Sequence, residues 1–201
     1  MIRNPFAIGM IVTLCMSNLI ASAQTIPEHV RNDLAKGSPS PPFAIPFIRH
    51  ILDMDLAQMA AQADLILTGS LKVKRTYLSP DETMILTDYT VVPSRIVFRR
   101  HEATHPAFGR ELTLTVEGGT MSIAGVQVSM VDSNMELPEG RVLLLVLHDR
   151  PDGNLAIVGD VQGAFDVSGN HVRHLLKQSS HADEYSTMIP QTLMDRLATG
   201  K

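Results

Sequence analysis

The chain has 201 residues, a formal net charge of −4, no tryptophan and an aromatic content of only 4%. A nucleic-acid-binding surface needs a basic face and aromatic side chains on which bases stack, so this composition argues against a nucleic-acid partner. The length suits one domain with a single hydrophobic core.

The first 23 residues read as a secretory signal peptide. Arg3 supplies a positive start, residues 6–20 form an apolar core, and Ala21-Ser22-Ala23 is an A-x-A cleavage site. The apolar run is short for a membrane span. Cys15 lacks the small preceding residue of a lipoprotein signal, because Leu14 stands there. We therefore expect a periplasmic or secreted protein with no membrane span after cleavage.

Cleavage would leave residues 24–201, which contain no cysteine. Export normally permits disulfides, so the mature domain has to be held together by its core alone. Arg3 is the only charged residue of the signal, and its loss changes the net charge to −5.

Two helices and a linker are expected before the strands begin. Residues 24–46 comprise a short helix starting near Pro27, with Val30 and Leu34 on one side, followed by a Pro/Ser linker. Residues 47–62 have apolar side chains at three- and four-residue spacing, which predicts an amphipathic helix with Pro46 at its start.

From residue 63 to residue 168 the period of the apolar residues changes to two, which predicts strands. Gly69 is expected at a bulge or tight bend, and Pro93 is expected to break its strand because proline cannot donate to a ladder. The expected strands are 65–73, 84–98, 112–116, 121–131 with an interruption at Gly125, 142–147, 155–158 and 163–167.

Residues 169–201 are expected to be a C-terminal tail that ends in a short helix, Pro190 to Leu197. His171, His174 and His181 would contribute to a metal site if residues 172–177 were helical; otherwise they are solvated side chains of the tail. Asp149, Asp152 and Asp160 are candidates for calcium, although the hairpin turn at 151–154 accounts for aspartate there.

The run from 63 to 167 resembles a loose group of exported bacterial proteins. The resemblance is carried by Ala63-Asp64, Gly118-Gly119, the segment 137–141 and the segment 159–167. It implies a mainly β fold with a five-stranded OB-like barrel, similar to netrin and metalloproteinase-inhibitor modules. Such inhibitors cap the target zinc through an N-terminal cysteine. The mature chain has none, so that mechanism is not carried over.

His101-Glu102-Ala103-Thr104-His105 matches H-E-x-x-H, the zinc-peptidase signature. The motif requires a helix, on which His101 and His105 share a face and bind Zn²⁺ while Glu102 acts as general base. Here the segment lies between two expected strands and runs into Pro106, which disfavours a helix. We therefore interpret it as a loop.

A third zinc ligand is also missing from the expected positions. The longer metzincin pattern requires Gly at 108 and His at 111, where this chain has Phe108 and Glu111. Glu136 would serve the shorter pattern, but it lies in a turn-like segment.

The sequence thus predicts an exported, non-enzymatic binding or accessory module for an unknown protein or small ligand, without a cofactor. The alternative is a zinc-dependent hydrolase that uses His101, Glu102 and His105. A structural component of the envelope is a further alternative. No sequence feature separates it from the binding module.

Overall fold

The computed structural model describes residues 24–37, 43–46, 53–100, 111–131, 137–176 and 179–200. The predicted signal peptide and the H-E-x-x-H segment lie outside these ranges. The helices are α1 (Ile26–Ala35), α2 (Leu56–Gln62), α3 (Ala182–Ser186) and α4 (Pro190–Thr199). The strands are β1 (Phe43–Pro46), β2 (Leu65–Leu78), β3 (Ile85–Arg99), β4 (Leu112–Glu117), β5 (Gly119–Ile123), β6 (Val126–Val131), β7 (Leu143–Asp149), β8 (Leu155–Ile157), β9 (Ala164–Asp166) and β10 (Arg173–His174).

Five of the strands close into a barrel. The hydrogen-bonded order β7-β2-β3-β4-β8 returns to β7 through the β7–β8 hairpin. The pairs are antiparallel except β4 with β8, which run parallel where Leu114 faces Leu155. The mainly β fold with a five-stranded OB-like barrel is therefore confirmed. Its interior is filled by leucine, isoleucine and valine side chains from all five strands.

Gly69 and Pro93 bend the barrel wall where the sequence predicted. The two residues face each other, and the register between β2 and β3 shifts next to them. A Cβ atom at Gly69 would lie 2.5 Å from the carbonyl oxygen of Val92, so only glycine allows the strands to approach this closely.

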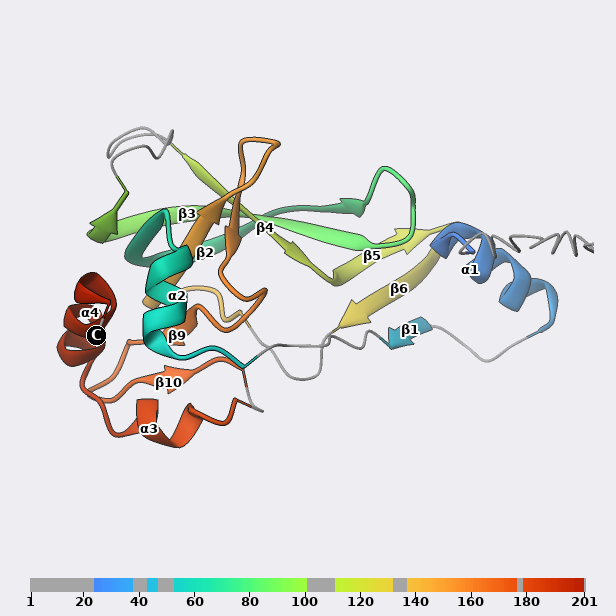
Figure 1. Ribbon diagram of the computed structural model, residues 1–201. Helices are drawn as coiled ribbons and strands as arrows, with labels where there is room; N and C mark the ends of the chain where they lie inside the picture. Colours follow the sequence, from blue (N-terminus) through green and yellow to red (C-terminus); the bar gives the residue numbers. More distant parts are fainter. Residues whose placement is uncertain are drawn as a thin grey trace, which may run out of the picture.

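Helices cover one part of the outside of the barrel. In Figure 1, α2 and α4 lie side by side at the left, against the barrel. Ile66 and Leu144 point outward from β2 and β7 into a second apolar cluster, which Met59 of α2 and Leu193 of α4 complete. Packing in this outer cluster, and not in the barrel interior, holds α2 and α4 against the barrel.

The helix predicted over 47–62 is shorter in the structure. Residues 53–55 are not helical, and α2 begins at Leu56. Asp55 caps it, because its carboxylate accepts from the Gln58 backbone while the Gln58 side chain accepts from the Asp55 backbone. Pro46 ends β1 instead of starting a helix.

The strand predicted over 121–131 is a hairpin. Its turn is Ala124-Gly125, with φ of +52° and +80°, and the flanking Ile123 and Val126 pair as β5 and β6. The hairpin lies outside the barrel ring. It forms a separate three-stranded sheet with β1, which runs parallel to β6.

The N-terminal helix covers this small sheet. Thr25 and Glu28 form a capping box at the start of α1, which lies beside β5 and β6 at the right of Figure 1. Val30 is buried against the hairpin, in agreement with its predicted position on the apolar side of the helix. Leu34, expected on the same side, is instead 41% exposed.

The segment after residue 168 is more than a polar tail. The predicted final helix is confirmed as α4, with Pro190 in its first turn. The segment also contributes β10, which extends the sheet beside β9, and α3, whose Tyr185 is buried. These residues belong to the core because apolar side chains at 172, 176, 193 and 197 point into it.

Candidate functional site: a cleft between β10 and α3

The H-E-x-x-H segment connects two barrel strands. β3 ends at Arg99 and β4 begins at Leu112, so a strand lies on each side of it, as predicted. His101, Glu102 and His105 lie outside the described residues, and so do Phe108 and Glu136. The zinc-hydrolase hypothesis therefore stays a prediction.

The histidines after the barrel do not form the metal site considered above. Residues 173–174 are a strand rather than part of a helix, and His174 is only 8% exposed. His171 is exposed, while His181 stacks on Tyr185 with ring centroids 5.8 Å apart. Within the described ranges, no group of three or more His, Cys, Asp or Glu side chains is placed to hold one ion.

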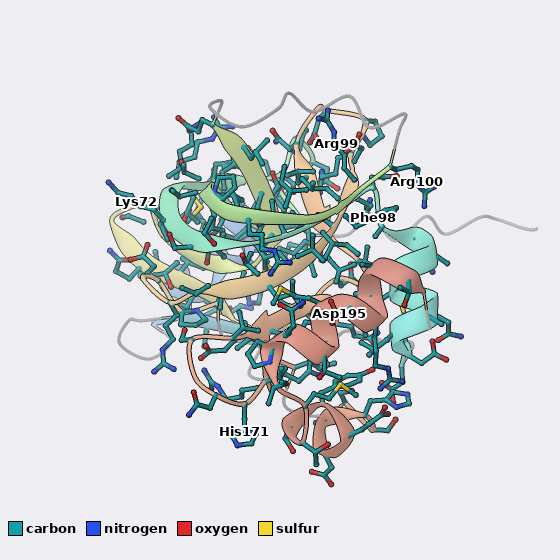
Figure 2. All side chains as sticks on the ribbon, turned by 90° about the vertical axis from the view of Figure 1, so that its left-hand side faces the viewer. Lys72, Phe98, Arg99, Arg100, His171 and Asp195 are labelled. Atoms are coloured by element: carbon teal, nitrogen blue, oxygen red, sulfur yellow. The ribbon has the colours of Figure 1, made fainter. Side chains whose placement is uncertain are left out.

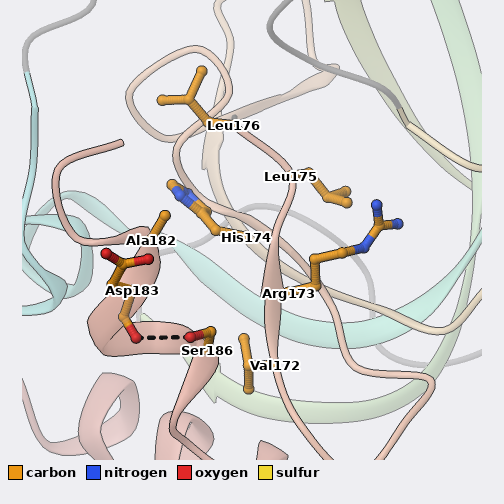
Figure 3. Close-up of a pocket in the computed structure, with 8 residues that line it drawn as sticks. All are labelled: Val172, Arg173, His174, Leu175, Leu176, Ala182, Asp183 and Ser186. Carbon is orange, nitrogen blue, oxygen red and sulfur yellow. Dashed lines mark hydrogen bonds between the residues drawn. The ribbon is translucent and has the colours of Figure 1, made fainter. Parts of the chain in front are cut away.

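A cleft of about 340 Å³ lies between β10 and α3. Its size is at the lower end of the range in which proteins bind small ligands. Figure 3 shows side chains of both elements around it, with Ala182 and Asp183 on the α3 side and His174 next to Ala182. The lining residues are Val172, Arg173, His174, Leu175, Leu176, Ala182, Asp183 and Ser186.

His174 is the buried polar group of the cleft wall. Its Nε2 lies 2.7 Å from the carbonyl oxygen of Gln162, so Nε2 carries the proton and donates it. Its Nδ1 is buried and has no hydrogen-bond partner. Burial lowers the pKa of His174, although the Gln162 bond opposes this. His174 is therefore a neutral ring at neutral pH.

Aromatic contacts hold this ring in place. Phe165 stacks on His174 with centroids 4.8 Å apart, and Tyr185 meets it edge-on at 5.4 Å. Burial raises the pKa of Tyr185 to about 12, so its hydroxyl keeps its proton and donates to the carbonyl oxygen of Met54 at 3.4 Å. The two rings thus pack an uncharged imidazole into the wall of the cleft.

The rim carries charges of both signs. Arg173 and Arg141 both bind Oδ2 of Asp166, at 3.1 and 2.8 Å. Burial alone would raise the pKa of Asp166, but hydrogen bonds from Ser168 and from the two arginines lower it far below its usual range. Two exposed arginines thus share one buried carboxylate, so this side of the rim keeps a net positive charge.

Asp183 leaves the opposite side of the rim negative. Its side chain is exposed, and Ser186 binds only its backbone oxygen, at 2.8 Å. The serine hydroxyl and the His174 ring are each engaged with a backbone carbonyl. They are therefore not paired with each other as nucleophile and base.

The sequence carries little signal for this site. Residues 172–176 read Val-Arg-His-Leu-Leu, in which apolar and polar side chains do not alternate with the period of a strand. The histidine pair at three-residue spacing is compatible with a helix instead. The position of α3 over β10 is a tertiary contact that no local pattern indicates.

The helices that the structure describes include none long and apolar enough to cross a membrane. In comparisons with known proteins, no family model, no curated protein and no solved structure matches the chain.

Proposed function

We propose that this protein is an exported, non-enzymatic binding module that takes a small amphipathic ligand into the cleft between β10 and α3. The observation that supports the proposal is the cleft of about 340 Å³ itself. Binding sites for small molecules are concave and mostly apolar, with a few polar groups that orient the ligand. Export rests on the signal-like residues 1–23.

The charge and polarity of the lining favour one class of ligand. Val172 and Leu176 are apolar residues of the lining, while Asp183 carries an exposed carboxylate at the rim. The guanidinium of Arg173 is bonded to Asp166, which it shares with Arg141, whereas the Asp183 carboxylate on the other side of the rim faces solvent. The cleft therefore suits an apolar body whose positively charged nitrogen lies on the Asp183 side.

Phenethylamine is a suitable first probe, because it joins an aromatic ring to an ammonium group. We expect chemical-shift changes in the NMR spectrum at Ala182 and His174, with weak, saturable binding. Asp183→Asn should weaken binding up to about fivefold, the range of an exposed ion pair. Ala182→Phe should abolish it by filling the cleft.

Matched controls exist in α4, where Asp195 and Ala198 are exposed. Asp195→Asn and Ala198→Phe should leave phenethylamine binding unchanged. Equal binding of phenylacetate, or binding that survives Ala182→Phe, would show that the cleft is not the site. A purely structural envelope protein would bind none of these probes.

A further inference from the structure

Two arginines meet at one buried carboxylate where β7, β9 and β10 lie side by side. Asp166 of β9 pairs in register with Leu143 of β7 and with Arg173 of β10. Its Oδ2 accepts from Nη1 of Arg141 at 2.8 Å and from Nη2 of Arg173 at 3.1 Å. Because both guanidinium groups contact the same oxygen atom, they are direct neighbours. We call Arg141 and Arg173 the arginine pair.

The arginine pair carries one positive charge more than its carboxylate balances. Hydrogen bonds keep the pKa of Asp166 far below its usual range, so this side chain contributes one full negative charge. In the part of the chain that the structure describes, neither guanidinium contacts a second carboxylate. Two like charges held this close repel each other, and an anion bound to both of them offsets that repulsion.

Another arginine on a buried carboxylate shows the balanced case. Arg75 donates through Nε to Oδ2 of Asp88 at 2.8 Å, and Asp88 is buried. One arginine faces one carboxylate there, so the two charges cancel and nothing favours an added anion. Of these two arrangements, only the arginine pair has a charge surplus.

The other carboxylates near the arginine pair are directed elsewhere. Glu139 precedes Arg141 by two residues, but its Oε1 accepts from the backbone N–H of Val73 in β2 at 2.8 Å. β2 and β9 lie on opposite sides of β7, so Glu139 and Asp166 are drawn to opposite sides of this strand. In Figure 3, the side chain of Arg173 points away from Asp183.

The outer side of the arginine pair is open to solvent. The side chains of Arg141 and Arg173 are 56% and 59% exposed, although Asp166 is buried. Each guanidinium uses one terminal nitrogen on Asp166, so the second terminal nitrogen and Nε remain as donors. Figure 2 shows that His171, two residues before Arg173, projects into solvent at this edge of the molecule.

We propose that the arginine pair binds a carboxylate, supplied by a small organic acid or by the C-terminus of a peptide. The two oxygens of a carboxylate match the donors of guanidinium groups. Its single negative charge balances the single surplus positive charge, whereas a dianion would place excess negative charge beside Asp166. Arginines held in place by a buried partner lose little freedom on binding. This binding does not depend on an amine in the cleft.

Acetate is the first probe, titrated into the purified protein at a constant ionic strength set with chloride. The NMR signals of the arginine side-chain N–H groups report on each guanidinium separately. We expect acetate to shift the signals of Arg141 and Arg173 with weak, saturable binding. The signal of Arg75, whose charge is balanced, should stay in place in the same sample.

Arg141→Gln tests the charge surplus, because it leaves one arginine on Asp166 and so creates the balanced case. Acetate binding should weaken by about fivefold, the range of an exposed ion pair. Arg95→Gln is the matched control, because Arg95 is also exposed and donates to the side chain of Gln191 at 3.2 Å. It should leave acetate binding unchanged, and circular dichroism should show that both variants stay folded.

N-acetylglycylglycine and its C-terminal amide distinguish the two sources of the carboxylate. Tighter binding of this acid than of acetate, with no binding of the amide, identifies a peptide C-terminus, and equal binding of the two acids identifies a small organic acid. The absence of shifts at the arginine pair overturns the proposal. So does an equal shift at Arg75, an equal loss in Arg95→Gln, or tighter binding of sulfate than of acetate.

Discussion

At the scale of single residues, His174 shows how burial changes a titratable group. Its pKa is lowered in the folded protein from the ordinary value of 6.5, mainly by burial. As the pH falls, the unfolded chain therefore takes up this proton before the folded one. The neutral His174 therefore stabilises the folded protein fully at pH values well above 6.5. This contribution to the free energy of unfolding is lost progressively as the pH falls below 6.5.

We therefore expect stability, measured by urea unfolding, to fall between about pH 7.5 and about pH 5.5. His174→Gln should remove part of this slope, because glutamine donates a hydrogen bond without titrating. His171→Gln, at an exposed position, should keep the slope. If both variants keep it, another group causes the pH dependence.

Asp166 does not interfere with this measurement. Its lowered pKa places its contribution at acid pH, because a carboxylate that is ion-paired in the folded state stabilises above its unfolded pKa, near 3.9. That contribution is lost only as the pH falls below about 4.

At the scale of elements, helix α2 depends on its cap. Asp55 accepts from the Gln58 backbone at 2.8 Å and closes the capping box. We expect Asp55→Ala to lower the free energy of unfolding by about 1 kcal/mol. Asp55→Asn should retain most of the stability, because asparagine caps equally well. Equal losses in chemical denaturation would mean that the charge, rather than the cap, matters.

The hairpin β5–β6 differs from the strand that the sequence predicts. The alternation over 121–131 with Gly125 predicts one interrupted strand, whereas the chain reverses at this glycine. Ala124 with a positive φ is unusual, and its neighbour Gly125 allows the two-residue turn. Whether a glycine interrupts a strand or reverses it depends on what pairs across it, here Ile123 with Val126.

At the scale of the whole molecule, the C-terminal segment is part of the core. Leu193 of α4 is fully buried in the cluster on the outside of the barrel. Leu193→Ala should lower the free energy of unfolding by about 2–5 kcal/mol. Leu34→Ala, in the exposed side of α1, should change it by less than about 0.5 kcal/mol. Thermal unfolding of both variants distinguishes a docked helix from a solvated tail.

The sequence by itself determined the elements whose pattern is local. The period-two alternation of 63–168 predicted the barrel strands. Gly69 and Pro93 predicted the bend in the barrel wall, because the backbone conformations open to glycine and proline are set by these residues and not by their tertiary contacts. Pro190 likewise marked the start of the final helix.

Only the tertiary structure decided which surfaces meet. The cleft exists because α3 lies over β10, and Arg75 is ordered because Asp88 reaches it from the neighbouring strand. His174 looks like any polar histidine in sequence, and its neutral state follows from Phe165 and Tyr185 around it. Burial and partners come from residues distant in the chain, so no local pattern contains them.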